Sequence, residues 1–248
     1  MNRSLYGMAV AIFLGFSLMT FGAITLSSQG QGVGTLTPDQ VDKINGQHIG
    51  YVITSTKTIP ELLATTTGDL HVTGGHLMGL GSGSYPGYPP SQLIEKTCRA
   101  GLVVLGRAGS GTSHLTPQQY FLYTDWGFSV EQVFKDNAKA PVQAGTSIVV
   151  VRPGGVLKIG NRTVYAIEQN FRDFHPGEEY LLFLEFIPET GAYRVAAEDG
   201  FAFEGTKTAR FTIGSHYPEL EVMSKDQLLK STRDALTANN CNSEAKKP

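Results

Sequence analysis

The sequence predicts a mainly β protein, and its composition is the first reason. Of the 248 residues only 17% are charged, whereas 29 are glycine and 10% are aromatic. Surface helices are usually richer in Lys, Glu and Arg, while strands favour aromatic residues and turns favour glycine. We therefore expect short strands joined by tight turns. The more specific expectation is an OB-like five-stranded antiparallel barrel with flanking helices, for which the strand pattern and a family resemblance are given below.

Apolar stretches give the expected strands. The segment 120–134 alternates apolar and polar residues until Gln132 interrupts the apolar face, which predicts one bent strand with a β-bulge near Glu131. Gly154-Gly155 predicts a turn with positive φ, and Asp199-Gly200 predicts a tight hairpin. Further strands are expected at 49–55, 102–106, 147–151, 163–167, 180–186 and 192–197, and together they predict a closed or nearly closed antiparallel sheet.

Capping sequences give the expected helices. Thr37-Pro38-Asp39-Gln40 has the N-cap, the first-turn proline and the returning Gln of a capping box, and one short helical turn is expected at 59–64. Another helix begins near Ser91 and ends at Gly101. A C-terminal helix is announced by a second capping box, Ser224 with Gln227, and by an apolar stripe that consists of Leu228, Leu229, Thr232, Ala235 and Leu236.

The first residues have the pattern of a targeting segment. Residues 8–26 contain no ionisable side chain and follow one early charge, Arg3, as in an export signal. The stretch is longer than the apolar part of most signals and near the minimum that spans a bilayer. Residues 1–28 are therefore interpreted as a signal peptide or an uncleaved membrane anchor, with a buried core helix as the third alternative. Either of the first two places the protein in the periplasm, the cell envelope or the extracellular space.

Composition also divides the rest of the chain. Residues 29–90 are interpreted as an N-terminal extension with a Gly/Pro-rich spacer, because 65–90 contains seven glycines and three prolines. A mobile surface loop that binds a ligand is the alternative for this segment. Residues 91–241 are expected to form the barrel domain with its C-terminal helix, and 242–248 a tail.

The chain has two cysteines, Cys98 and Cys241. Export would place them in an oxidising compartment, where they can form a disulfide. Both are expected near the ends of helices, so the disulfide requires those two helix ends to meet. The alternative is two independently buried thiols, which behave as small hydrophobic residues.

Four segments in order carry a family resemblance: 102–107 (LVVLGR), 128–135 (FSVEQVFK), 149–155 (VVVRPGG) and 176–184 (PGEEYLLFL). This order resembles a group of exported bacterial proteins, and is similar to the netrin-like modules that include tissue inhibitors of metalloproteinases. The resemblance spans about residues 91 to 240 and implies an OB-type five-stranded barrel with a C-terminal helix. Those inhibitors present an N-terminal cysteine to zinc, whereas Cys98 lies deep in this chain, so the resemblance does not extend to their inhibitory role.

Catalytic motifs are largely missing from the sequence. No serine lies in a G-x-S-x-G elbow, and Lys207 stands one position too late for a phosphate-binding loop. The best metal candidates are Asp69, His71 and His76 in the glycine-rich segment, although two solvated histidines are the simpler interpretation. A net charge of −2 gives no electrostatic footprint for nucleic acid.

These observations favour an exported, non-enzymatic binding module that contacts a protein or glycan partner through its loops and needs no cofactor. Two alternatives stay open. One is an exported metal-dependent enzyme that uses Asp69, His71 and His76. The other is a structural protein that contacts the membrane through an uncleaved N-terminal segment.

Overall fold

The structure is a computed structural model that describes residues 36–49, 52–53, 56–75, 90–168, 173–204, 208–211 and 224–237. The described residues all belong to one compact unit, which begins at Leu36. The expected signal or anchor, residues 1–28, and the expected tail, residues 242–248, lie outside the described residues. No helix within the described ranges is long and apolar enough to cross a membrane.

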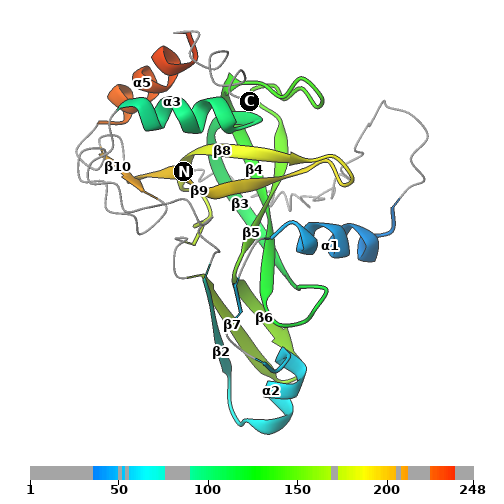
Figure 1. The fold of residues 1–248 in the computed structure, drawn as a ribbon. Coiled ribbons are helices and arrows are strands. Elements are labelled where there is room, and N and C mark those ends of the chain that lie inside the picture. Colours follow the sequence, from blue (N-terminus) through cyan, green and yellow to red (C-terminus); the bar gives the residue numbers. More distant parts are fainter. Residues whose placement is uncertain are drawn as a thin grey trace, which may run out of the picture. The chain divides into compact units, whose positions relative to one another are not determined.

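The fold is mainly β, with two sheets and helices at their margins (Figure 1). The described helices are α1 (Pro38–Gln47), α2 (Ile59–Thr65), α3 (Pro90–Arg99) and α5 (Lys225–Thr237). The smaller sheet has the order β1-β2-β7-β6, formed by Val52–Ile53, Leu70–Gly75, Arg162–Glu168 and Gly155–Ile159. The larger sheet has the order β10-β9-β5-β4-β3-β8, formed by Thr208–Phe211, Ala192–Glu204, Ser147–Pro153, Leu122–Lys135, Leu102–Leu115 and Glu179–Ile187.

Pairings in the larger sheet form a circuit. β8 pairs with β3 and also with β9, and β9 pairs with β5, so the neighbours run β3–β4–β5–β9–β8–β3. The β5–β9 pair is parallel, with Val150 opposite Tyr193 and Val151 opposite Arg194. The expectation of a purely antiparallel sheet is therefore wrong at this pair. The chain passes through β6, β7 and β8 before it reaches β9, and such a long connection allows two neighbours to run in the same direction.

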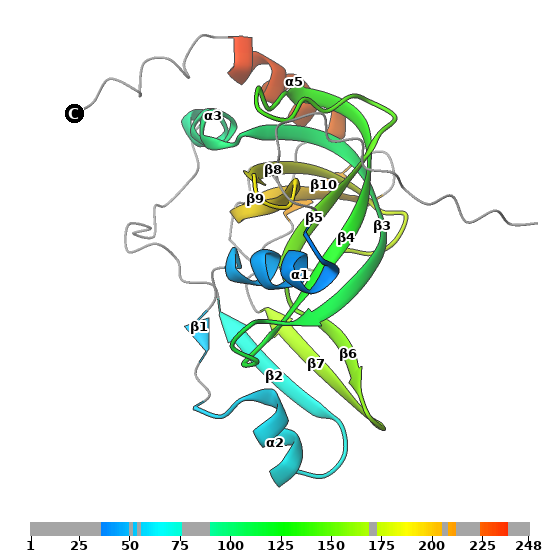
Figure 2. The same ribbon diagram turned by 90° about the vertical axis from the view of Figure 1, so that its right-hand side faces the viewer.

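The predicted bulge in β4 is confirmed. Val130 lies opposite Gly106 and Gln132 lies opposite Leu105, so Glu131 is the extra residue on β4. A bulge of this kind bends its strand and increases the local twist, and β3 and β4 are visibly curved in Figure 2.

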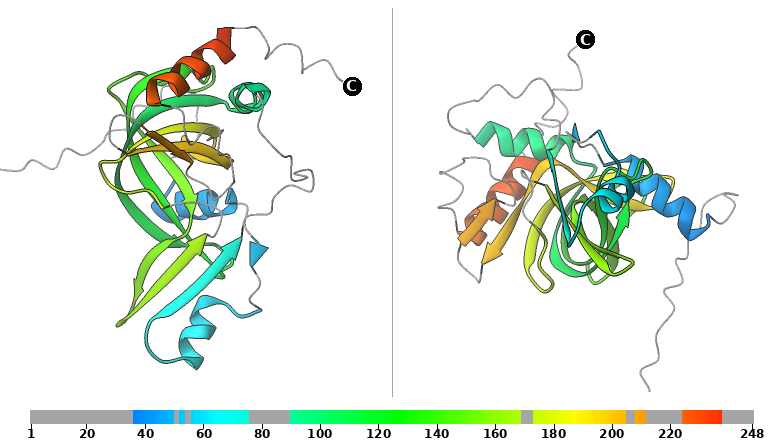
Figure 3. Two further views of the ribbon diagram at one scale, coloured as in Figure 1. Left: turned by 90° about the vertical axis from the view of Figure 1, so that its left-hand side faces the viewer. Right: turned by 90° about the horizontal axis from the view of Figure 1, so that it is seen from below.

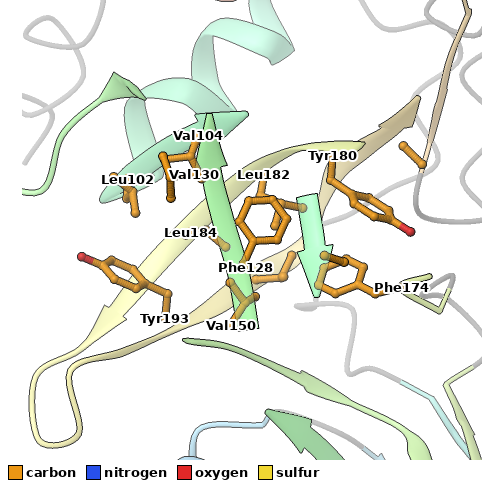
Figure 4. Close-up of a cluster of buried hydrophobic side chains, with 13 residues drawn as sticks. Leu102, Val104, Phe128, Val130, Val150, Phe174, Tyr180, Leu182, Leu184 and Tyr193 are labelled. Atoms are coloured by element: carbon orange, nitrogen blue, oxygen red, sulfur yellow. The ribbon is translucent and has the colours of Figure 1, made fainter. Parts of the chain in front are cut away.

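Two apolar clusters lie on opposite faces of β3 and β8. The first cluster includes Leu102, Val104, Leu182 and Leu184, together with side chains from β4, β5 and β9 and the ring of Phe174 (Figure 4). The second lies under α3 and α5 and contains Leu93, Val103, Leu105, Leu181, Phe183, Phe201, Phe203, Leu228 and Leu229 among its members. Because both faces are buried, these strands carry unbroken apolar runs instead of alternating ones.

Helices α3 and α5 lie side by side (Figures 1 and 2), and buried charges fix them to the sheet. The Lys135 ammonium donates to the carbonyl oxygens of Thr97 and Cys98 at the end of α3, at 3.0 and 2.8 Å. Burial lowers the pKa of Lys135. Lys225 at the start of α5 pairs with Glu179, a carboxylate that is buried on β8. Each helix is thus held by a cation as well as by apolar packing.

Cys98, in the last turn of α3, is disulfide-bonded. The sequence contains one other cysteine, Cys241, which lies outside the described residues. The pairing of Cys98 with Cys241 therefore stays a prediction.

The expected spacer contains a strand. Residues 70–75 form β2, which pairs in parallel with β7 from the middle of the chain. Leu70 and Val72 face the apolar cluster of the small sheet, and a Cβ on Gly74 would lie 2.8 Å from the Phe121 ring. The glycine-rich composition predicts a loop here, but the segment is a strand. Gly74 is a glycine because the backbone packs closely against Phe121. The compact unit begins at Leu36, so it does not start at the boundary expected near residue 90. Residues 76–89 lie outside the described ranges.

The predictions for the helix caps and for the Gly154-Gly155 turn are confirmed, whereas one predicted hairpin is wrong. The capping boxes of Thr37 with Gln40 and of Ser224 with Gln227 are present, and Gly154 and Gly155 have φ of 89° and 142°. The hairpin expected at Asp199-Gly200 is wrong, because β9 continues through it. Leu182 lies opposite Gly200 and Leu184 lies opposite Val195, so β9 bulges between those two pairs instead of turning back.

Gly106 tests the close contact between β3 and β4. A Cβ at this position would lie 2.1 Å from the Ser129 carbonyl oxygen and 2.7 Å from the Phe128 ring. We expect Gly106→Ala to lower the free energy of unfolding by at least ~2 kcal/mol, since the strands must separate to admit the methyl group. The matched control is Gly127→Ala, where the nearest atom is 3.8 Å away. Chemical denaturation measures both, and equal stability of the two variants would contradict the register.

Candidate functional site

Helix α1 covers one part of the circuit. Its capping box fixes where it starts, and Ile44 packs, together with Ile49, against Tyr123, Val151, Ile187 and Ala192. These four partners come from β4, β5, β8 and β9. The helix thus lies against strands from most of the circuit (Figure 3).

A cluster of ionisable side chains lies between α1 and the β3–β4 pair. The His114 imidazole of β3 lies between two carboxylates: its Nδ1 is 3.1 Å from Oδ2 of Asp42 on α1. Its Nε2 is 3.8 Å from Oδ2 of Asp125 on β4. Within the described part of the chain, Asp42, His114 and Asp125 are the one group of three or more possible metal ligands, with their ligand atoms all within 4.8 Å of one another. We call these three residues the α1 cluster.

Neighbouring side chains hold the α1 cluster in place. The buried Asn45 amide donates to both carboxylate oxygens of Asp125 at 3.3 Å, and its own carbonyl oxygen accepts from the Thr190 hydroxyl at 2.7 Å. The Tyr123 hydroxyl donates to the Asp42 backbone carbonyl at 2.7 Å, and the Tyr123 ring stacks on His114 with centroids 5.1 Å apart. A second side-chain contact therefore orients His114 and Asp125, whereas Asp42 is held through its backbone.

Further contacts fasten the end of α1. Arg194 of β9 donates to the His48 carbonyl at 3.0 Å and also pairs with Glu185 of β8. The His48 imidazole lies 3.7 Å from Glu189, in the turn between β8 and β9. Polar groups from three strands, β3, β4 and β9, and from one turn thus contact the helix and its C-terminal end.

Burial and neighbouring charges shift the pKa values of two groups in and beside the α1 cluster. Burial raises the pKa of the Asp125 carboxyl; the Asn45 hydrogen bond and His114 lower it in part, and the charge of Asp42 raises it again. Burial also raises the pKa of Tyr123, and the Asp125 and Asp42 charges raise it further. Tyr123 therefore keeps its proton and donates throughout the neutral range.

The sequence-based metal candidates are not brought together in this way. Asp69 accepts from the Thr163 backbone N–H at 2.9 Å and so caps the start of β7. His71 stacks on Tyr165 with centroids 4.7 Å apart and an interplanar angle of 9°. His76 lies outside the described residues. No sequence motif identifies the α1 cluster, because its residues come from three elements and their side chains meet only in the folded chain.

A second feature is the outer face of the small sheet. His71 and Val156 lie on either side of Tyr165 across β2, β7 and β6, and Thr73 lies beside Ile167. The exposed large apolar side chains among the described residues are Val149, Val156 and Ile167, of which Val156 and Ile167 are 55% and 50% exposed. We call the surface formed by His71, Thr73, Val156, Tyr165 and Ile167 the outer face.

No protein-family model matches the chain, and no curated protein matches it. Its function must therefore be inferred from the geometry of the fold and of these two features.

Asn45 links the α1 cluster to the β8–β9 turn, and its removal tests that link. Asn45→Ala leaves the Asp125 carboxylate and the Thr190 hydroxyl without this partner, at a cost of ~1–3 kcal/mol. We expect amide hydrogen exchange in α1 to become at least ~10-fold faster while β8 is unchanged. Gln47→Ala, at an exposed position of the same helix, is the control. Equal exchange in the two variants would show that Asn45 does not hold the helix.

Proposed function

We propose that this chain is an exported binding module, built on an OB-type five-stranded barrel, that contacts a partner protein through the outer face of its small sheet. Two facts support the barrel. The strand neighbours follow a closed circuit with one parallel pair, and a C-terminal helix packs on the outside of that circuit, as in the netrin-like arrangement that the sequence resembles.

The observation that carries the binding proposal is the outer face itself. Val156 and Ile167, each at least half exposed, lie beside a stacked His71–Tyr165 pair on one side of a single sheet. Isolated exposed apolar side chains are ordinary, but a contiguous group that includes an aromatic ring is typical of an interaction site. The inner side of the same strands is already occupied by the apolar cluster around Ile59, Phe121 and Val164.

The chemistry of the outer face favours a protein over a glycan. Aliphatic side chains and a tyrosine suit the apolar core of a protein interface. A sugar needs an open ring face to stack on, whereas one face of the Tyr165 ring is covered by the nearly parallel His71 ring. The partner we propose is therefore a protein that presents an apolar patch.

Export is part of the proposal. The apolar N-terminal stretch, which ends before the compact unit begins at Leu36, supports it. The disulfide at Cys98 supports it as well, since stable disulfides are characteristic of oxidising compartments.

Site-specific photo-crosslinking tests the proposed surface. The full-length chain carries a benzophenone amino acid in place of Tyr165 and is irradiated in cells of the source organism. We expect one protein adduct that protease removes and glycosidase does not. Adding Ile167→Glu should reduce the adduct at least ~10-fold, because a charge in the apolar centre of an interface is poorly tolerated.

The matched control is Val149→Glu, which places the same charge at an exposed valine of β5 that lies on the larger sheet. We expect this variant to keep the adduct. An adduct that is insensitive to Ile167→Glu, an adduct with glycan alone, or an adduct between two copies of this chain would each overturn the proposal. Circular dichroism of each variant shows that the fold is retained.

A further inference from the structure

The α1 cluster combines three donors that divalent metal ions accept. Asp42, His114 and Asp125 provide two carboxylates and one imidazole, from a helix and two strands that are distant in sequence. The 3.1 Å between Asp42 Oδ2 and His114 Nδ1 is close to the ligand–ligand separation around an ion with bonds of about 2 Å. Asp125 lies somewhat farther out, with Oδ2 3.8 Å from Nε2.

The hydrogen-bonding capacity of His114 supplies an independent reason to expect a cation. A neutral imidazole has one N–H, so it can donate to one carboxylate only. Both of its nitrogens face a carboxylate oxygen, so when the imidazole is neutral one of these contacts has no proton to share, and a cation bound at that nitrogen would satisfy it.

No lysine or arginine among the described residues neutralises these two carboxylates. Among the ion pairs of the described residues, Asp42 and Asp125 each pair with His114 and with no lysine or arginine.

The surroundings resemble those of a metal ligand set. The Asn45 amide fixes Asp125, and Thr190 in turn fixes Asn45, as outer partners orient metal ligands. The side chains of Asp42, His114 and Asp125 are 38%, 23% and 18% exposed, so water can reach the remaining coordination positions. One nitrogen with carboxylate oxygens suits Zn²⁺ and similar transition ions better than Ca²⁺, which prefers oxygen ligands alone.

We propose that Asp42, His114 and Asp125 form a binding site for one divalent transition-metal ion of the Zn²⁺ type, which joins helix α1 to the β3–β4 pair. The site is separate from the outer face and from Asp69, His71 and His76. The role that we propose for the ion is structural, because it joins helix α1 to the strand circuit.

Calorimetry on the full-length chain, stripped of metal with a chelator, tests this site. We expect Zn²⁺ to bind with a stoichiometry of one and to raise the thermal unfolding temperature, with Ca²⁺ at least ~100-fold weaker. His114→Gln and Asp42→Asn should each weaken Zn²⁺ binding at least ~10-fold. Both side chains are partly exposed, so these variants are expected to fold, which circular dichroism checks.

His71→Ala and His175→Ala are the matched controls, each removing an exposed histidine elsewhere on the chain. We expect them to bind Zn²⁺ as the unaltered chain does. Co²⁺ in place of Zn²⁺ adds a second readout, a visible absorption band that His114→Gln removes.

Three results would overturn the metal site. One is no Zn²⁺ binding at pH 7.5, which would leave a proton as the cation held by His114. Another is binding that survives His114→Gln and Asp42→Asn. The third is binding that His71→Ala abolishes, which would move the ion to the glycine-rich segment. The first two results do not bear on the crosslink from the outer face.

Discussion

The parallel pairing of β5 with β9 is the constraint on which the other features depend. It consists of two residue pairs, Val150 with Tyr193 and Val151 with Arg194. Parallel neighbours cannot be joined by a hairpin and need a long connection, and the connection here contains β6, β7 and β8. Two of the three strands that carry the outer face, β6 and β7, lie in this connection. Val151 is also part of the apolar contact with α1, so the helix docks where the circuit closes.

The two candidate features differ in chemistry and in their relation to the fold. The α1 cluster is polar, partly buried and held by contacts from β3, β4 and the β8–β9 turn, so it belongs to the attachment of the N-terminal segment. The outer face carries the exposed apolar side chains of Val156 and Ile167, and the core beneath it consists of the opposite side of the same strands. The residues that attach helix α1 to the strands therefore differ from those that we propose contact a partner protein.

Much of the fold could be predicted because its determinants are local. The bulge at Glu131, the capping boxes and the turn at Gly154 all follow from residues within a few positions of one another. What could not be predicted depends on contacts between distant residues. Gly74 belongs to strand β2 because its close packing against Phe121 leaves no room for a side chain. Asp199-Gly200 stays within β9 because β9 pairs with β8 at Gly200 and again at Val195. The α1 cluster could not be predicted for the same reason, while the metal site expected at Asp69, His71 and His76 stays a prediction because His76 lies outside the described residues.

Interstrand nuclear Overhauser effects in the isotope-labelled full-length chain test the strand circuit most directly. A parallel β5–β9 pair should give contacts between amide and Hα protons for Val150 with Tyr193 and for Val151 with Arg194, with no strong Hα–Hα contact, because closely opposed Hα atoms are a feature of antiparallel pairs. The same spectra should connect β8 to β3 and to β9. Strong Hα–Hα contacts between β5 and β9, or no contacts at all between these strands, would contradict the circuit and with it the OB-type barrel that we propose.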